Sequence, residues 1–187
     1  MARLLLGHIP TLCQQAPRGL QTRADAEGRP ASWLAGRVLL AQQFAGLPAI
    51  GFGAQGKPHF IDTSLPAFNL SHSGDHIALA ICSRGAVGCD IEQMRTRLWR
   101  NALLTHVLPA AELTRFASLS AIEQQHLFWP HWTAREAALK QRGDSVWAMS
   151  AELSLPDGVC LHQGQQANLA WAVCCPCPQP PRPELPL

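Results

Sequence analysis

The chain has 187 residues, of which 47% are hydrophobic and 15% are charged, and its formal net charge is +2. A chain of this size and composition can bury one sizeable core, which excludes a largely disordered protein. The small positive charge does not predict nucleic-acid binding, but it suits an acidic protein partner or a phosphorylated ligand.

The apolar stretch at the N-terminus is shorter than that of a signal peptide, and no later segment is long enough to cross a bilayer. We therefore expect a soluble, cytoplasmic protein that has no membrane partner. Seven cysteines without a secretory signal favour reduced thiols over a disulfide framework. Cys13, Cys82 and Cys89 are expected to be small core residues.

The first half of the chain reads as a strand, a helix and then several strands. Its expected elements are a strand at 2–9, a helix capped by Ser32 and ended by Gly46, and strand-like segments at 49–60 and 68–82. The short SRG connection at 83–85 then predicts a hairpin that leads into residues 86–92.

The second half repeats this order of elements. Its expected elements are helices over 99–142 and, beyond Gly143, strand-like segments at 145–155, 158–162 and 168–175. The repetition predicts an α+β fold with an N-terminal half at 1–84 and a C-terminal half at 85–175. Residues 176–187 are so rich in proline that we expect a disordered tail.

Two carboxylates, Asp90 and Glu92, end an apolar run in the segment VGCDIE. On a strand their side chains point the same way, about 6 to 7 Å apart, while Ile91 faces the core. Repulsion between partly buried carboxylates is relieved by protonation, by a basic neighbour or by a divalent cation. The simpler alternative is a strand end at which both carboxylates lie in water.

The segment FWPHWTAREAALKQRG, residues 128–143, has a helical pattern. On that helix Trp132, Glu136 and Lys140 share one stripe, so a carboxylate and an ammonium face the same way. An ordinary solvated ion pair would give the same spacing. However, the chain has thirteen arginines and only two lysines, and an ammonium, unlike a guanidinium, can donate a proton as well as contact a phosphate.

Two further segments contain candidate anion-binding groups. Lys57 lies in the turn QGKP, whose glycine lets the backbone approach a ligand, although an ordinary turn residue is the alternative. In FNLSHSGD, residues 68–75, we expect Ser71, His72 and Ser73 to crowd onto one turn that holds an anion. A serine hydrolase built on Ser71 is a rival interpretation, which the missing G-x-S-x-G motif disfavours.

The segment CCPC at 174–177 contains a Cys-x-x-Cys spacing. Cys174 and Cys177 could bind zinc if Cys160 and His162 completed four ligands. Because there is no second Cys-x-x-Cys pair, we instead expect these cysteines to end a terminal strand.

In their order and spacing, GKP, FNLSHSGD, VGCDIE and FWPHWTAREAALKQRG, together with WLAGRVLL, resemble the signature regions of the Sfp-like phosphopantetheinyl transferases, most closely the AcpT branch. The resemblance covers roughly residues 30–146. It implies two pseudo-symmetric α+β halves with the active site in the cleft between them, in a monomer. Enzymes of this family transfer the 4'-phosphopantetheine group of coenzyme A to a serine of an apo acyl or peptidyl carrier protein, require Mg²⁺, and release adenosine 3',5'-bisphosphate.

The resemblance also implies roles for individual residues. The Mg²⁺ ligands would be Asp90, Glu92 and Glu136, and Lys140 would neutralise or protonate the leaving phosphate. The coenzyme A phosphates would lie among Arg37, Lys57 and His72, with Ser71 and Ser73 as further donors. The base that takes the serine proton, Glu136 or a metal-ordered water, stays open.

Two residues depart from the family pattern. Pro130 interrupts a helix that usually runs unbroken, so we expect a kink or a fresh helix start near His131. Arg135 replaces a lysine that is common just before the catalytic glutamate, which keeps the charge but changes its geometry.

Carrier proteins are acidic, so the segment RTRLWR predicts a docking surface formed by Arg95, Arg97 and Arg100. A solvated helix start is the alternative. The remaining rival to the transferase is a module that binds coenzyme A or a nucleotide without reacting, which has no need of three converging carboxylates.

Overall fold

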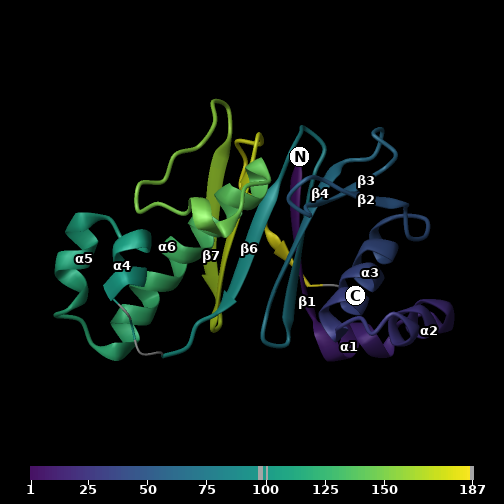
Figure 1. Ribbon diagram of the computed structural model, residues 1–187, viewed down its shortest axis with the longest axis horizontal. Helices are drawn as coiled ribbons and strands as arrows, with labels where there is room; N and C mark the ends of the chain where they lie inside the picture. The colour runs from purple at the N-terminus through teal and green to yellow at the C-terminus, as the bar shows by residue number, and fades with distance from the viewer. Residues whose placement is uncertain (97–98, 100, 186–187) are drawn as a thin grey trace.

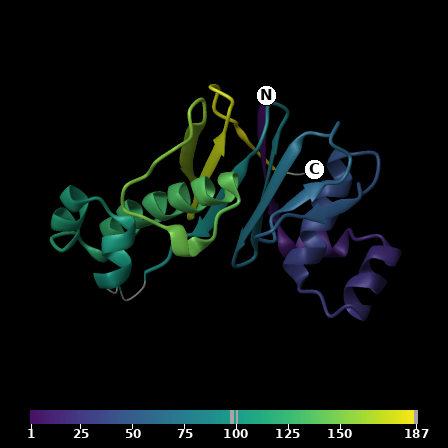
Figure 2. The same cartoon turned by 45° about the horizontal axis from the view of Figure 1, so that its top comes forward.

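Two β-sheets pack face to face at the centre of the computed structural model, which describes residues 1–96, 99 and 101–185 (Figure 1). The first sheet has the strand order β4-β5-β1-β9 and the second has the order β6-β8-β7. Helices cover the outer face of each sheet, α3 on one side and α6 on the other (Figures 1 and 2). This arrangement is the α+β fold predicted from the sequence.

The N-terminal part of the chain forms the first sheet, a small two-stranded sheet and three helices. Its elements are β1 (Ala2–His8), α1 (Ile9–Gln14), α2 (Arg18–Ala26), α3 (Ala31–Gln43), β2 (Ile50–Phe52), β3 (Pro58–Phe60), β4 (Ala67–Ser73) and β5 (His76–Cys82). The helix predicted from Ser32 begins one residue earlier, at Ala31, and Pro30 is its N-cap. Proline suits a helix start because the first N–H groups of a helix have no partner within it.

The rest of the chain forms the second sheet and a long helix that packs on it. Its elements are β6 (Gly88–Gln93), α4 (Asn101–Val107), α5 (Ala110–Phe116), α6 (Ala121–Arg142), the 3₁₀ turn η1 (Val146–Ala148), β7 (Cys160–Gln166), β8 (Leu169–Cys175) and β9 (Pro183–Glu184). Helix α6 begins with a capping box between Ser120 and Glu123 and ends at Gly143, whose φ is 81°. It continues through Pro130, so the fresh start predicted near His131 is wrong.

The predicted hairpin across residues 83–85 is wrong. Strand β5 pairs with β4 on one edge and with β1 on the other, whereas β6 pairs with β8 in the second sheet. Because both edges of β5 are already paired, residues 83–87 cross from one sheet to the other. The hairpin lies instead between β4 and β5, where Gly74 adopts a φ of 56°.

The segment predicted as a strand at 145–155 contains only η1 and irregular backbone. Its apolar residues Leu153 and Leu155 alternate as on a strand, but they pack against the small cluster beneath α6. The strand prediction for this segment is therefore wrong. The alternating apolar residues are the buried side of an irregular loop.

The segment predicted to be a disordered tail contacts the first sheet through part of its length, although Leu185 is 72% exposed. Strand β9 pairs in parallel with β1, Arg3 donates to Glu184 over 2.7 Å, and Cys177 is buried. Proline lacks a backbone donor, so it is accepted at the sheet edge where β9 lies. The division of the chain at residue 84 stays a prediction, and β9 joins the sheet of the first half.

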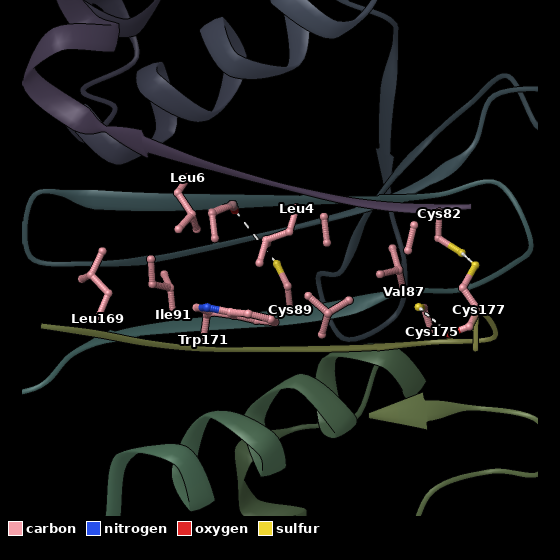
Figure 3. Packing of buried hydrophobic residues seen from close by; sticks show 14 residues of the cluster. Leu4, Leu6, Cys82, Val87, Cys89, Ile91, Leu169, Trp171, Cys175 and Cys177 are labelled. Carbon is pink, nitrogen blue, oxygen red and sulfur yellow. Dashed lines mark hydrogen bonds between the residues drawn. The ribbon is translucent and has the colours of Figure 1, made fainter. Parts of the chain in front are cut away.

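A core of fourteen buried residues fills the space between the two sheets (Figure 3). On β6, Cys89 and Ile91 point into this core. The alternation of a strand then directs Gly88, Asp90 and Glu92 to the opposite face, toward α6.

None of the described helices is both long and apolar enough to cross a membrane.

Candidate active site

Gly88 allows α6 to pack directly on β6. A Cβ atom at this position would lie 2.1 Å from the carbonyl oxygen of Ala137 and 2.2 Å from the amide nitrogen of Gln141. The backbone of the helix therefore lies directly against the backbone of the strand. Glu136 and Lys140, which directly precede the contact residues Ala137 and Gln141, are held close to the carboxylates of β6. Gly88 lay within the VGCDIE motif, but its role depends on a tertiary contact that the sequence alone does not reveal.

Asp90 is the most buried carboxylate of the site, with a side chain 4% exposed. Its Oδ1 accepts hydrogen bonds from Ser71 Oγ at 2.7 Å and from Lys140 Nζ at 2.6 Å. Its Oδ2 is buried and has no hydrogen-bond partner among the described residues. Burial raises the pKa of Asp90, and the charge and hydrogen bond of Lys140 oppose that rise.

Glu92 and Glu136 complete a group of three carboxylates. Glu92 accepts a hydrogen bond from Ser73 Oγ at 2.5 Å, and Glu136 lies 3.7 Å from Lys140 Nζ with a side chain 15% exposed. Burial raises the pKa of both residues, and repulsion from Asp90 adds to it in each case. These mutual effects show that the three carboxylates share one electrostatic environment.

Lys140 Nζ lies among these carboxylates and also donates to Ser71 Oγ at 3.1 Å. Burial alone lowers its pKa, but attraction to Asp90 and Glu136 outweighs burial and raises the pKa overall. One ammonium faces three carboxylates, so the group is short of positive charge and every member binds protons more tightly than usual. A divalent cation would supply the missing charge.

The oxygen atoms of the three carboxylates do not all lie within 4.8 Å of one another. Within the described ranges, only Cys82, Cys175 and Cys177 bring three metal-ligating atoms within 4.8 Å of one another. The carboxylates of Asp90 and Glu136 instead share the ammonium of Lys140. The assignment of Asp90, Glu92 and Glu136 as metal ligands therefore stays a prediction.

Strand β4 supports the carboxylates from the neighbouring sheet. Ser71 and Ser73 point toward β6, and Asn69 Oδ1 accepts the backbone N–H of Cys89 at 2.8 Å. His72 is exposed, and the strand alternation turns it to the opposite face. The prediction that these groups crowd onto one turn is thus wrong: they lie on a strand, where Ser71 and His72 face apart. This separation also removes the basis for a hydrolase that pairs these two residues.

Lys57 connects the first half to the residue before β6 and to α6. Its Nζ donates to the carbonyl oxygens of Val87 at 2.9 Å and Gln141 at 3.0 Å, and burial lowers its pKa. A pocket of about 600 Å³ opens beside it, lined from the first half by Phe60 and Phe68 and from the second half by Arg142. Residues from both sides of position 84 also line a second cavity, beside His8 and Asn168, but of these two cavities the first is the one that contains a predicted site residue, Lys57.

Arg37 lies apart from the carboxylates, on α3. Its guanidinium carbon is 4.9 Å from the centre of the Trp33 ring, which also has Arg23 and Arg29 nearby at 5.7 and 5.5 Å. Burial lowers the pKa of Arg37, and the two other guanidinium groups add to that effect. Among the described residues no hydrogen bond or ion pair joins Arg37 to the carboxylate group.

Of the predicted docking arginines, only Arg95 lies within the described residues, where it is exposed. Arg97 and Arg100 lie outside them. The backbone carbonyl of Arg95 accepts a hydrogen bond from Trp129 Nε1 at 3.3 Å, which fixes its position against α6.

Arg135, which replaces a family lysine, does not face the carboxylates. Its guanidinium donates to the backbone carbonyls of His131, Ser150 and Ala151, so it holds the loop after η1 against α6. A planar group with five donors suits such a multiple contact, which one ammonium could not reproduce.

The alternative zinc set of Cys160, His162, Cys174 and Cys177 does not come together. Cys174 packs under α6, whereas Cys177 lies in the core between the sheets, and His162 Nε2 lies 2.7 Å from the carbonyl oxygen of Cys177. On β8 the successive residues Cys174 and Cys175 face opposite sides, and Cys177, beyond the end of the strand, lies on the side of Cys175.

Comparison with known proteins shows the family to which the chain belongs. A sequence profile of the 4'-phosphopantetheinyl transferase superfamily matches residues 86–172, which include β6 and α6. The chain is 42% identical over 181 residues to the 4'-phosphopantetheinyl transferase AcpT of Salmonella typhimurium, covering 95% of this chain and 94% of the relative. It is 39% identical over 180 residues to AcpT of Escherichia coli K12, covering 95% and 92%. The chain therefore belongs to the 4'-phosphopantetheinyl transferase family, in its AcpT branch.

Proposed function

We propose that this protein transfers the 4'-phosphopantetheine group of coenzyme A to a serine of an apo acyl or peptidyl carrier protein, with Mg²⁺ as cofactor and adenosine 3',5'-bisphosphate as the second product. The observation that carries the proposal is that Asp90 and Glu136 share the ammonium of Lys140 while Glu92 lies on the same strand face as Asp90, and that the pKa of all four groups is raised. A non-catalytic binding module would have no use for such a costly group of buried charges.

The residues fit a magnesium ion. All three carboxylates offer hard oxygen ligands, which Mg²⁺ prefers, and two come from one strand while the third comes from a helix. Asp90 Oδ2 is buried without a hydrogen-bond partner among the described residues, which a cation would satisfy. When bound, Mg²⁺ would neutralise charge on the two phosphates of the pyrophosphate linkage.

The protein's own groups then supply positioning and proton transfer. Ser71 and Ser73 orient the carboxylates of Asp90 and Glu92 through hydrogen bonds of 2.7 and 2.5 Å. Lys140, with a raised pKa and three donors, stabilises the leaving phosphate. We further propose that Lys57 and the pocket beside it hold the nucleotide end of coenzyme A. Arg37 and His72 are proposed to contact its phosphates.

Mass spectrometry of the carrier protein tests the reaction. We expect apo carrier protein incubated with coenzyme A, Mg²⁺ and the enzyme to gain the mass of phosphopantetheine, and EDTA to abolish the gain. Coenzyme A binding without transfer would support the binding module instead. Cleavage of coenzyme A in EDTA would support the hydrolase. Both results would contradict the proposal.

We also propose that carrier proteins dock on Arg95, Arg97 and Arg100. The exposure of Arg95 next to β6 supports this, because acidic helices are attracted to such a surface. Reversal of Arg95 and Arg97 to glutamate should raise the KM for carrier protein at unchanged KM for coenzyme A. Equal changes in both KM values would reject the docking surface.

Since both halves of the site come from one chain, we propose that the enzyme acts as a monomer, in the cytoplasm.

A further inference from the structure

Three buried cysteines meet at one end of the core between the sheets, away from the carboxylate site (Figure 3). Cys82 ends β5, Cys175 ends β8, and Cys177 follows two residues later in the segment that leads to β9. Their sulfur atoms all lie within 4.8 Å of one another, and Sγ of Cys82 and Sγ of Cys177 are 3.5 Å apart. They are 0%, 0% and 1% exposed, respectively.

The spacing of these sulfur atoms suits a metal ion. Metal–sulfur bonds of roughly 2.3 Å in a trigonal arrangement place the sulfurs about 4 Å apart, which lies inside the observed range. In the part of the chain that the structure describes, no fourth His, Cys, Asp or Glu brings a ligand atom into this group. We propose that Cys82, Cys175 and Cys177 form a three-coordinate thiolate site for one Cu(I) ion.

The ligand set selects the ion. Structural zinc sites take four protein ligands in a tetrahedron, and this group offers three in a buried place from which water is excluded. Soft thiolates favour Cu(I), which is stable with only two or three sulfur ligands. The site is independent of the transferase chemistry, because none of its residues contacts the carboxylate group.

Binding would displace protons from the thiols to solvent. Burial raises the pKa of Cys82 and Cys175, and hydrogen bonds from the backbone of Arg84 and Cys177 to these sulfurs oppose the rise. Such N–H donors stabilise sulfur once it is ionised. The bound ion would then tie β5 to the end of β8 and the segment that follows it, since Cys82 and Cys177 are 95 residues apart in the sequence.

The site is tested by competition for Cu(I) between the protein and a chromophoric chelator, bicinchoninate, under anaerobic reducing conditions. We expect the full-length protein to take one equivalent, and Cys175→Ser and Cys177→Ser each to weaken the affinity by at least about tenfold. Cys174→Ser is the matched control: this residue is also 0% exposed, but it packs toward α6, and its loss should leave Cu(I) affinity unchanged.

The wild-type protein alone provides a second readout, should a variant fail to fold. X-ray absorption of the Cu(I)-loaded protein should show three sulfur neighbours and no nitrogen or oxygen. The proposal is overturned by uptake that does not depend on Cys175 and Cys177, by an equal loss in Cys174→Ser, by a coordination shell other than sulfur, or by the absence of any uptake.

Discussion

At the scale of single residues, the site is defined by charges that the fold makes costly. Asp90, Glu92 and Glu136 each have a raised pKa because burial disfavours the ionised carboxylate, and repulsion from Asp90 adds to the rise at Glu92 and Glu136. Lys140 offsets only part of this repulsion. Such a group lowers the stability of the folded protein, which is the expected cost of a site prepared to bind a cation.

Glu136→Gln tests this balance through its pH dependence. A carboxyl whose folded pKa is raised destabilises the folded state at pH values above that pKa, and the cost disappears as the pH falls and the group takes up its proton. In the absence of metal, we therefore expect Glu136→Gln to have a higher Tm than wild type at pH 8, and the difference to shrink by pH 5.

The measurement is thermal unfolding of both proteins in EDTA at the two pH values. Ser120→Ala serves as the control, since it removes a surface helix cap distant from the site and should lower Tm similarly at both. A variant that is less stable than wild type at pH 8 would contradict the electrostatic account of Glu136.

At the scale of elements, the site depends on the contact between β6 and α6. Gly88 makes that contact possible, because any side chain there would meet the helix backbone. The side chains of Asp90 and Glu136 can face each other only while this close approach is kept. The contact also explains why Asp90 on the strand and Glu136 and Lys140 on the helix lie close to Gly88.

Gly88→Ala should therefore damage both stability and function. Its Cβ would lie 2.1 Å from Ala137 O, so the helix must move, and we expect a loss of about 3 kcal/mol in the free energy of unfolding. Gly19→Ala is the matched control, since nothing lies within 4 Å of that position on α2. There we expect a gain of about 0.5–1 kcal/mol from helix propensity.

Chemical denaturation of the two variants and the wild type measures these changes. If Gly88→Ala unfolds at the same denaturant concentration as wild type, α6 does not pack on β6 as described, and the placement of Glu136 opposite Asp90 is then unsupported.

Sequence patterns predicted these elements better than their pairing. The strand-like segments at 68–82 and 168–175, which are largely apolar runs, are real strands, and the side-by-side placement of Asp90 and Glu92 follows from the strand period alone. The local sequence pattern of a strand does not identify the strand with which it pairs. The sequence therefore predicted a hairpin between the segments that form β5 and β6, which lie in different sheets. The positions of Asp90 and Ser71 opposite each other come from the contact between the sheets, which no single segment encodes.

At the scale of the whole molecule, the two sheets and the C-terminal segment form one connected core. Hydrogen bonds join β4 to β6: Ser71 and Ser73 donate to the carboxylates of β6, and Asn69 accepts the backbone N–H of Cys89. Strand β9 extends the first sheet after the chain has completed the second. The proline content of residues 176–187 predicted disorder because composition ignores the unpaired edge of β1, which accepts a short parallel strand.

Thiol reactivity reports on this core. Five of the seven cysteines are buried, and only Cys13 and Cys160 are partly exposed. Burial raises the pKa of Cys174 and Cys175 to about 12, so at pH 8 these groups are neutral thiols, which are poor nucleophiles. We expect Ellman's reagent to titrate two cysteines in the native protein and seven in denaturant. Rapid reaction of more than two native thiols would contradict the packing of the C-terminal segment.

The most direct test of the transferase site is the rate of phosphopantetheine transfer to apo acyl carrier protein as Mg²⁺ is varied, in wild type, Asp90→Asn, Glu92→Gln and Glu136→Gln. If the three carboxylates hold one ion, each variant should require more Mg²⁺ for half-maximal rate. At low Mg²⁺, kcat/KM should fall by at least about 100-fold, which is the size of effect expected when one electrostatic contact to a transition state is lost. Wild-type rates and an unchanged Mg²⁺ requirement in Glu136→Gln would show that the helix does not contribute a ligand, and would contradict the site described.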